Sequence, residues 1–194
     1  DLGGFDGFSF VPCFCEDDDF LIRAKLKGYE LKTCDSAITY HFVSQTSRFS
    51  DDYKNDRLKI EMSSNRNFVR KWGLPIHGFN QVRYWEENTF TYNTFTMGLK
   101  TRNKSLLYSV EPFFDKIDLG LIPDDYIENE QKNTRYDLRS KFTLTDGVDV
   151  MITETSPFTE EDISMLQLIR LSIPYYEPGE YKTGNMLIKI NRQI

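Results

Sequence analysis

Four consecutive acidic residues, at positions 16–19, directly precede a short apolar-periodic segment in this 194-residue chain. Phe20, Leu21 and Ala24 recur at the spacing of one helix face. Gly28 follows where a helix would end in the left-handed conformation, which favours a residue without a Cβ atom. The pattern therefore predicts a helix with an acidic first turn, because unpaired backbone N–H groups and the helix dipole favour negative charge there.

These acids allow two interpretations. A helix start keeps nearby carboxylates ionised, which suits a general base or a metal ligand and equally suits an ordinary helix cap. Within the run, Glu16 and Asp19 are expected to orient the helix start and to hydrogen-bond either a substrate or Arg23. Arg23 lies four residues after Asp19, a spacing that also predicts a simple ion pair along the helix.

The next stretch predicts two short strands and then a helix. Residues 29–33 alternate and residues 37–42 are β-prone, so His41 is expected at the end of a strand, where functional residues are common. Residues 51–71 are typical of a largely solvent-facing helix, and Gly73 supplies a breaker that ends it.

After residue 105 the chain carries a series of alternating strand and helix signals. In chain order they are a strand at 106–110, a charged helix at 125–142, a turn at Asp146-Gly147, a strand at 148–153, a helix after residue 159 and a strand at 186–190. Thr159 is the expected N-cap of the strongest helix, because acids fill the first turn after it and Pro174 stops it. This order predicts a small α/β or α+β module at 106–194, whose role the sequence leaves unknown.

Composition narrows the classes of function. Hydrophobic residues make up 39% of the chain and aromatic residues 14%, which favours a globular fold. A net charge of −6 without a basic patch argues against nucleic acid as a partner. The sequence contains no run of about 18 apolar residues that would predict a membrane span. Its three sparse cysteines, Cys13, Cys15 and Cys34, predict reduced thiols and a cytoplasmic location.

Several short motifs occur in order along residues 1–75. They are Gly3-Gly4-Phe5-Asp6, Glu16-Asp17 with Asp19, Arg23, Gly28-Tyr29 and His41. Together they resemble the C-terminal, acceptor-side half of a family 2 glycosyltransferase with the GT-A fold. The resemblance implies an α/β fold class, with a partial GT-A-like catalytic domain at 1–85 and the accessory module at 106–194. It also implies that a nucleotide-binding half with an Asp-x-Asp metal motif precedes residue 1, and little activity is expected of the chain without it.

The resemblance further implies roles for individual residues. Asp17 would be the catalytic base with Glu16 beside it, and His41, about two dozen residues later, would bind Mn²⁺ or Mg²⁺. The residues expected to bind substrate are Gly4, Asp6, Asp19, Arg23 and Trp72. Taken alone, Trp72 predicts a core residue, although a tryptophan beside a sugar site also stacks on a pyranose face.

The expected function is therefore inverting, metal-dependent sugar transfer. The donor would be a nucleotide-diphospho-sugar and the acceptor a hydroxyl of a glycan or another molecule. The alternative is a non-catalytic remnant of the same fold that binds carbohydrate or protein. An upstream segment that supplies the Asp-x-Asp motif would decide between them, because the base alone gives no site for the nucleotide.

Overall fold

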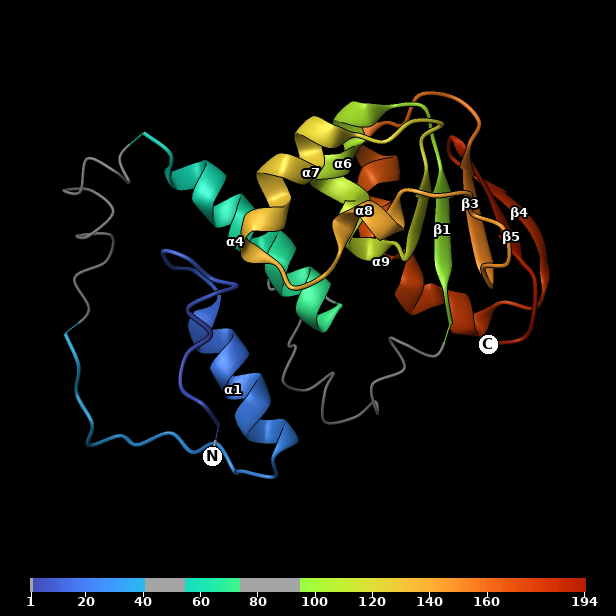
Figure 1. The fold of residues 1–194 in the computed structure, drawn as a ribbon. Helices are drawn as coiled ribbons and strands as arrows, with labels where there is room; N and C mark the ends of the chain where they lie inside the picture. The colour runs from blue at the N-terminus through green and yellow to red at the C-terminus, as the bar shows by residue number, and fades with distance from the viewer. Residues whose placement is uncertain (1, 41–54, 74–94) are drawn as a thin grey trace.

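The computed structural model describes residues 2–40, 55–73 and 95–194, and Figure 1 shows how they are arranged. Within these ranges the fold is mixed α/β, with one five-stranded sheet and six α-helices. The two N-terminal helices, α1 (Glu16–Leu26) and α4 (Arg57–Trp72), lie to one side of the sheet, and the other four belong to the C-terminal part of the chain.

The sheet has the strand order β2-β1-β3-β5-β4. Its strands are β1 (Met97–Lys100), β2 (Lys116–Asp118), β3 (Val150–Glu154), β4 (Gly179–Thr183) and β5 (Met186–Ile190). Strand β1 pairs in parallel on both sides, with β2 and with β3, whereas β5 is antiparallel to both β3 and β4. The two edges of the sheet are therefore β2 and β4.

One face of the sheet forms the main core. Alternate strand residues point into it, because side chains on a strand alternate between the two faces. The buried strand residues are Met97, Leu99, Ile117, Val150, Ile152, Met186, Ile188 and Ile190. The helices α6 (Leu107–Val110) and α9 (Glu160–Ser172) cover this face, and they contribute apolar residues that include Leu107 and Leu166.

The predicted start of α1 and the predicted ends of both N-terminal helices are confirmed, whereas α4 begins at Arg57 and not at residue 51. Helix α1 begins at Glu16 with four acids in its first turn, and Gly28 lies just beyond its end with a φ angle of +83°. Helix α4 ends at Gly73, which has a φ angle of +82°. A residue with a Cβ atom would be strained at either position, so the two glycines explain why the helices stop there.

Helix α9 and strand β5 are also as predicted, whereas strand β4 was not expected from the sequence. Thr159 accepts a hydrogen bond from the backbone of Asp162, whose carboxylate accepts one in return from the backbone of Thr159. This reciprocal capping box satisfies two N–H groups at the helix start. The carboxylate of Asp162 also accepts from the backbone of Asn185 in the β4–β5 turn, so the cap fastens the hairpin to the helix.

The predicted strand at 106–110 is wrong, because residues 104–110 form a 3₁₀ turn followed by helix α6. Leu106, Leu107 and Val110 are buried, and their spacing places them on one helix face. A short apolar run does not by itself distinguish a strand from a helix. The sheet also begins before residue 106, since β1 belongs to it.

Two further predictions are wrong. Residues 29–33 and 37–40 form no strand and their side chains are exposed. No strand in the described ranges pairs with them, and residues 41 and 42 lie outside those ranges. The predicted helix at 125–142 is broken into α7 (Asp124–Glu130), a 3₁₀ turn and α8 (Leu138–Lys141). Asp137 is the N-cap of α8, and its side chain accepts a hydrogen bond from the backbone N–H of Arg139.

Helix α4 packs on both parts of the chain. Val69 belongs to the main core, whereas Phe68 packs with Phe10 and Cys15 in a second, smaller cluster. The division into domains at 1–85 and 106–194 therefore stays a prediction. Helix α4 contributes side chains to the cores of both parts.

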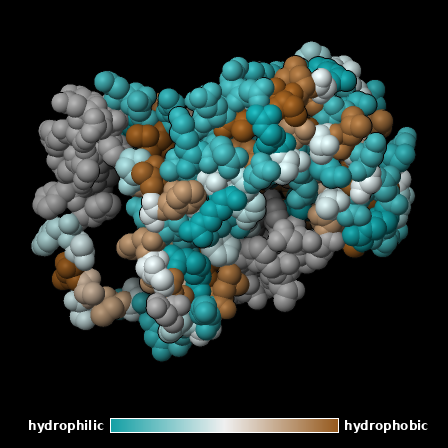
Figure 2. Space-filling model, viewed as in Figure 1, coloured by the Kyte–Doolittle hydropathy of each residue, from teal (hydrophilic) through white to brown (hydrophobic). Residues whose placement is uncertain are grey.

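The surface is mostly hydrophilic on the face shown in Figure 2, with hydrophobic side chains in small separate groups. No helix in the described ranges is long enough and apolar enough to span a membrane.

Candidate functional site

The carboxylate of Asp19 is the centre of a polar network at the start of α1. The residue is fully buried, with 0% of its surface exposed. It accepts hydrogen bonds from Arg23 Nε and Trp72 Nε1, both at 2.9 Å, and its Oδ1 lies 2.7 Å from Lys71 Nζ. Three donors therefore satisfy one buried carboxylate, which is what a buried charge requires.

Lys71 connects Asp19 to Asp6, whose Oδ2 lies 2.7 Å from the same ammonium group. Asp6 also accepts hydrogen bonds from the backbone N–H groups of Phe8 and Ser9 and from the Ser9 hydroxyl. Partial burial raises the pKa of Asp6, but the hydrogen bonds from Lys71 and Ser9 outweigh it and hold this pKa well below its ordinary value. The carboxylate is therefore ionised at neutral pH.

Arg23 ties the N-terminal loop into the same network. Its guanidinium donates to the backbone carbonyls of Leu2 and of Gly4, the latter at 2.6 Å. Gly3 and Gly4 have φ angles of +75° and +74°, which bring the loop carbonyls over the arginine. We call Gly4, Asp6, Asp19, Arg23, Lys71 and Trp72 the Asp19 network.

The structure thus brings together all five residues that were predicted to bind substrate. They come from three segments that are distant in sequence: the N-terminal loop, α1 and the end of α4. The sequence analysis missed Lys71, which joins the two carboxylates. Its position beside Trp72 at the end of a predicted helix carried no signal of its own, because the contact spans 65 residues.

Asp17 and Glu16 lie in the same first turn of α1 as Asp19, but the environment of their carboxylates differs from that of Asp19. Asp17 is exposed, and its Oδ1 accepts a hydrogen bond of 3.0 Å from the backbone N–H of Asp18. Glu16 is partly buried, and its Oε2 is a buried oxygen without a hydrogen-bond partner among the described residues. The two carboxylates therefore keep acceptor capacity, unlike the saturated carboxylates of the Asp19 network.

The N-cap of α1 is Cys15, which has a φ angle of +73° and makes no side-chain cap. Burial raises the pKa of its thiol, and the negative charges of Asp18, Glu16 and Asp17 raise it further. The thiol is therefore protonated at neutral pH and does not act as a nucleophile. Its Sγ lies 3.4 Å from Asn65 Oδ1, which ties the helix start to α4.

The predicted metal ligand, His41, lies outside the described residues. Within those residues, no group of three or more His, Cys, Asp or Glu side chains could hold a metal ion. Asp6 and Asp19 are engaged by Lys71 and Arg23. The described carboxylates therefore do not by themselves form the expected Mn²⁺ or Mg²⁺ site.

A cavity of about 320 Å³ lies at the end of α4, next to the Asp19 network. Lys71 and Trp72 line one side of it, and Asp137, Ser140 and Lys141 from the start and body of α8 line another. It is large enough for a sugar-sized ligand, which fits the lower end of the volumes of ligand pockets.

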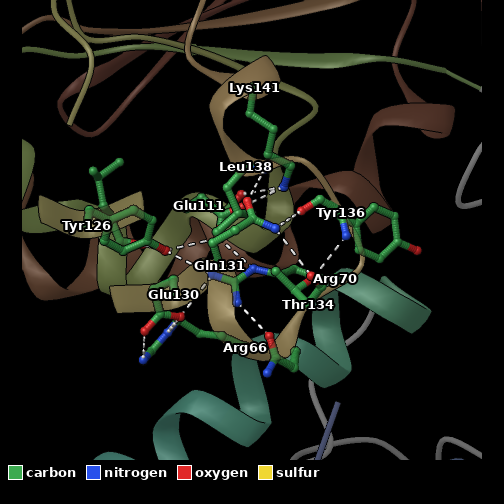
Figure 3. Close-up of polar contacts among 12 residues, drawn as sticks. Arg66, Arg70, Glu111, Tyr126, Glu130, Gln131, Thr134, Tyr136, Leu138 and Lys141 are labelled. Carbon is green, nitrogen blue, oxygen red and sulfur yellow. Dashed lines mark hydrogen bonds and ion pairs between the residues drawn. The ribbon is translucent and has the colours of Figure 1, made fainter. Parts of the chain in front are cut away.

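A second network, shown in Figure 3, joins α4 to the C-terminal part of the chain, and most of its side chains are buried. Arg70 donates to Glu111 Oε2 at 2.6 Å and to Glu130 Oε2 at 3.0 Å, and Arg66 forms a bidentate pair with Glu130. Lys141 reaches the other oxygen of Glu111 at 2.7 Å. We call these five residues, together with Tyr126, the Arg70 network.

The pairing in the Arg70 network keeps the carboxylate of Glu111 charged. Burial raises the pKa of Glu111, but Lys141 and Arg70 outweigh it and lower the pKa to about 2. The hydroxyl of Tyr126 donates to Glu111 Oε2 at 3.0 Å, and burial raises the pKa of this hydroxyl above its ordinary value. None of these groups was singled out by the sequence analysis, since their partners are 15–64 residues apart in the chain.

Comparison with known proteins gives no relative for this chain. No protein-family model, no curated protein and no solved structure matches it.

Proposed function

We propose that this chain forms the acceptor-binding side of a glycosyltransferase that transfers a sugar from a nucleotide-diphospho-sugar to an acceptor hydroxyl with inversion. The observation that carries the proposal is the assembly of the Asp19 network. Residues that resemble family motifs in three separate segments meet there, with the carboxylates of Glu16 and Asp17 on the same first helical turn.

Asp17 is proposed as the general base. Its carboxylate is exposed to an incoming acceptor, and the backbone N–H of Asp18 holds one of its oxygens. As the acceptor hydroxyl attacks the anomeric carbon, the other oxygen would take the hydroxyl proton. Glu16 is proposed to position the helix start beside the base rather than to contact the acceptor, because its Oε2 is buried.

The Asp19 network has a positioning role in this proposal. Asp19 binds Arg23 and Lys71, and these cations fix the N-terminal loop and the end of α4 around the helix start. The ring of Trp72 lines the neighbouring cavity, where it offers a face for an apolar side of a sugar. The acceptor would therefore bind between the helix start and this cavity.

Metal dependence and the nucleotide-sugar donor rest on the family resemblance and on His41. A divalent ion would offset negative charge on the departing diphosphate. No step assigned to the described residues passes through that ion, because they do not assemble its ligands.

A non-catalytic carbohydrate- or protein-binding role is the second candidate. It is favoured by the saturation of Asp6 and Asp19, which are held by Lys71, Arg23 and Ser9 and have little capacity left for a ligand. In that case the motif residues would stabilise a binding surface.

Replacement of Asp17 by Asn tests the proposal in the natural polypeptide that carries these residues. The change keeps the shape of the side chain and removes the base, so turnover is expected to fall by about 10²–10⁴-fold while acceptor binding is retained. The measurement is the rate of sugar transfer together with acceptor affinity from calorimetry.

Asp18→Asn is the matched control, since it removes the same charge from the same helical turn. We expect transfer to be nearly unchanged in this variant. Full activity in the Asp17→Asn variant would exclude the base assignment, and acceptor binding without any transfer in the unmodified protein would favour the second candidate.

A further inference from the structure

Strand β4 forms a free edge of the sheet. Figure 1 shows it at the outer margin of the molecule, and among the described residues it pairs only with β5. An exposed edge carries unpaired N–H and C=O groups and is a ready template for another strand. Two further features of β4 indicate which strand fits.

The first feature is the direction of its backbone groups. A two-residue turn at 184–185 joins the strands, so Thr183 faces Met186 as the first pair of the hairpin. In such a hairpin this pair exchanges both hydrogen bonds, and every second residue repeats the pattern. The N–H and C=O groups of Glu180 and Lys182 therefore point away from β5 toward the free edge.

The second feature is the charge pattern of the same two residues. Glu180 and Lys182 are exposed and flank Tyr181 symmetrically, with opposite charges. If a second β4 pairs antiparallel about a two-fold axis through Tyr181, Glu180 of each copy lies opposite Lys182 of the other. Opposite charges that face each other across strands stabilise the pair, and like charges destabilise it.

A single charge on an edge strand ordinarily discourages pairing, because no partner neutralises it. The pattern here is different, since each charge meets its opposite in the two-fold register. Glu180 Oε1 lies 3.9 Å from Lys189 Nζ of β5, a long contact between exposed groups that leaves Glu180 available. Lys182 has no ion-pair partner in the described part of the chain.

The other face of the same edge is apolar. Tyr181 packs against the main core and stacks edge-on with Tyr176, at 5.2 Å between ring centroids. Beside them a cavity of about 300 Å³ opens between α9 and the hairpin, and Met165 and Tyr176 on its rim are exposed. In the two-fold register the two Tyr181 residues lie directly opposite each other on this face, where aromatic pairs stabilise a sheet.

We infer that β4 is the contact strand of a homodimer, in which two copies of the chain pair antiparallel about Tyr181. Four backbone hydrogen bonds would form between Glu180 and Lys182 of the two copies. Two ion pairs would close one face of the joined sheet. The tyrosines and the rims of the two apolar cavities would cover the other.

Charge variants of the 194-residue chain test this inference by sedimentation velocity, over about 1 µM to about 1 mM protein. The unmodified chain of 22.8 kDa is expected to sediment as a dimer at the upper end of this series. Glu180→Lys and Lys182→Glu each place like charges opposite each other twice, so each should raise the dissociation constant by about 10–100-fold.

Two combinations of the same substitutions are the controls for folding and for the register of the two strands. An equimolar mixture of the two single variants restores both ion pairs in a heterodimer, and the double variant Glu180→Lys with Lys182→Glu restores them in a homodimer. Both should recover the dissociation constant of the unmodified chain to within a few-fold. Recovery also shows that the single variants are folded.

Three results would overturn the inference. They are an unmodified chain that stays monomeric at the highest concentration, single variants that dimerise as well as the unmodified chain, and combinations of the substitutions that stay monomeric.

Discussion

Two consecutive residues of α4, Arg70 and Lys71, serve two ionic networks that differ in burial. Arg70 and its partner Glu111 have side chains that are 1% and 0% exposed. Lys71 is 26% exposed, and of its two partners Asp19 is buried whereas Asp6 keeps some contact with solvent. The Arg70 network is therefore the more buried of the two, and the Asp19 network is the more accessible to solvent.

The difference has a physical basis. Charges in a dry interior need complete pairing, and removal of one partner leaves the others unsatisfied. In the Asp19 network, water can reach Lys71 and so replace part of a lost interaction. Breakage of the Arg70 network should therefore cost more stability than breakage of the Asp19 network.

Glu111→Gln is expected to have the largest effect. The change leaves Arg70 and Lys141 facing a neutral group in a buried site, so the free energy of unfolding should fall by about 3–5 kcal/mol. Urea denaturation followed by circular dichroism measures it. Asp125→Asn is the control, because Asp125 forms an exposed pair with Lys104, and such pairs contribute about 0–1 kcal/mol. Equal losses in both variants would remove the distinction between buried and exposed pairs.

Acid should weaken the Arg70 network in a defined range of pH. The pKa of Glu111 is lowered from 4.5 to about 2, so the folded state binds its proton less readily than the unfolded state. Its contribution is complete above pH 4.5 and is lost as the pH falls toward 2, by about 3 kcal/mol in total.

The difference in stability between the unmodified chain and Glu111→Gln checks this dependence. It should be constant above about pH 5 and should shrink as the pH falls, because the amide side chain of the variant does not titrate. A difference that stays constant down to about pH 2 would show that Glu111 does not carry the acid sensitivity.

Asp19→Asn tests the Asp19 network in the same way. Its expected effect on stability is smaller than that of Glu111→Gln or of acid. Asn keeps one acceptor oxygen for Trp72 but loses the charge that Arg23 and Lys71 share, so stability should fall by about 1–3 kcal/mol. Asp18→Asn on the same turn is the control. A loss as large as that of Glu111→Gln would show that the Asp19 network contributes as much stability as the buried one.

Local chemistry in the sequence predicts a substantial part of this fold. The acidic start of α1, the glycines after α1 and α4, and the N-cap at Thr159 all lie where the residue types indicate. The ion pair between Asp19 and Arg23 follows from helix geometry in the same way. Each of these features depends on residues within about one helical turn of each other.

The errors arise where a segment needs distant neighbours to choose its structure. Residues 29–33 have a strand pattern but pair with no strand in the described part of the chain, whereas residues 107–110 form a helix because the core offers them one apolar face. The candidate site follows the same rule. Its motif residues were recognisable one by one, but Lys71 and its link between Asp6 and Asp19 were not.

The sequence by itself therefore determined where α1 and α9 begin, where α1 and α4 end and which carboxylates stand at the start of α1, because caps, glycines and helix dipoles act within a few residues. Tertiary structure decided the strand order, the sharing of α4 between two cores and the pairing of Arg70 and Lys71 with different networks. Those choices depend on burial, which removes water from charges and apolar faces only after distant segments meet, and burial is a property that no local pattern contains.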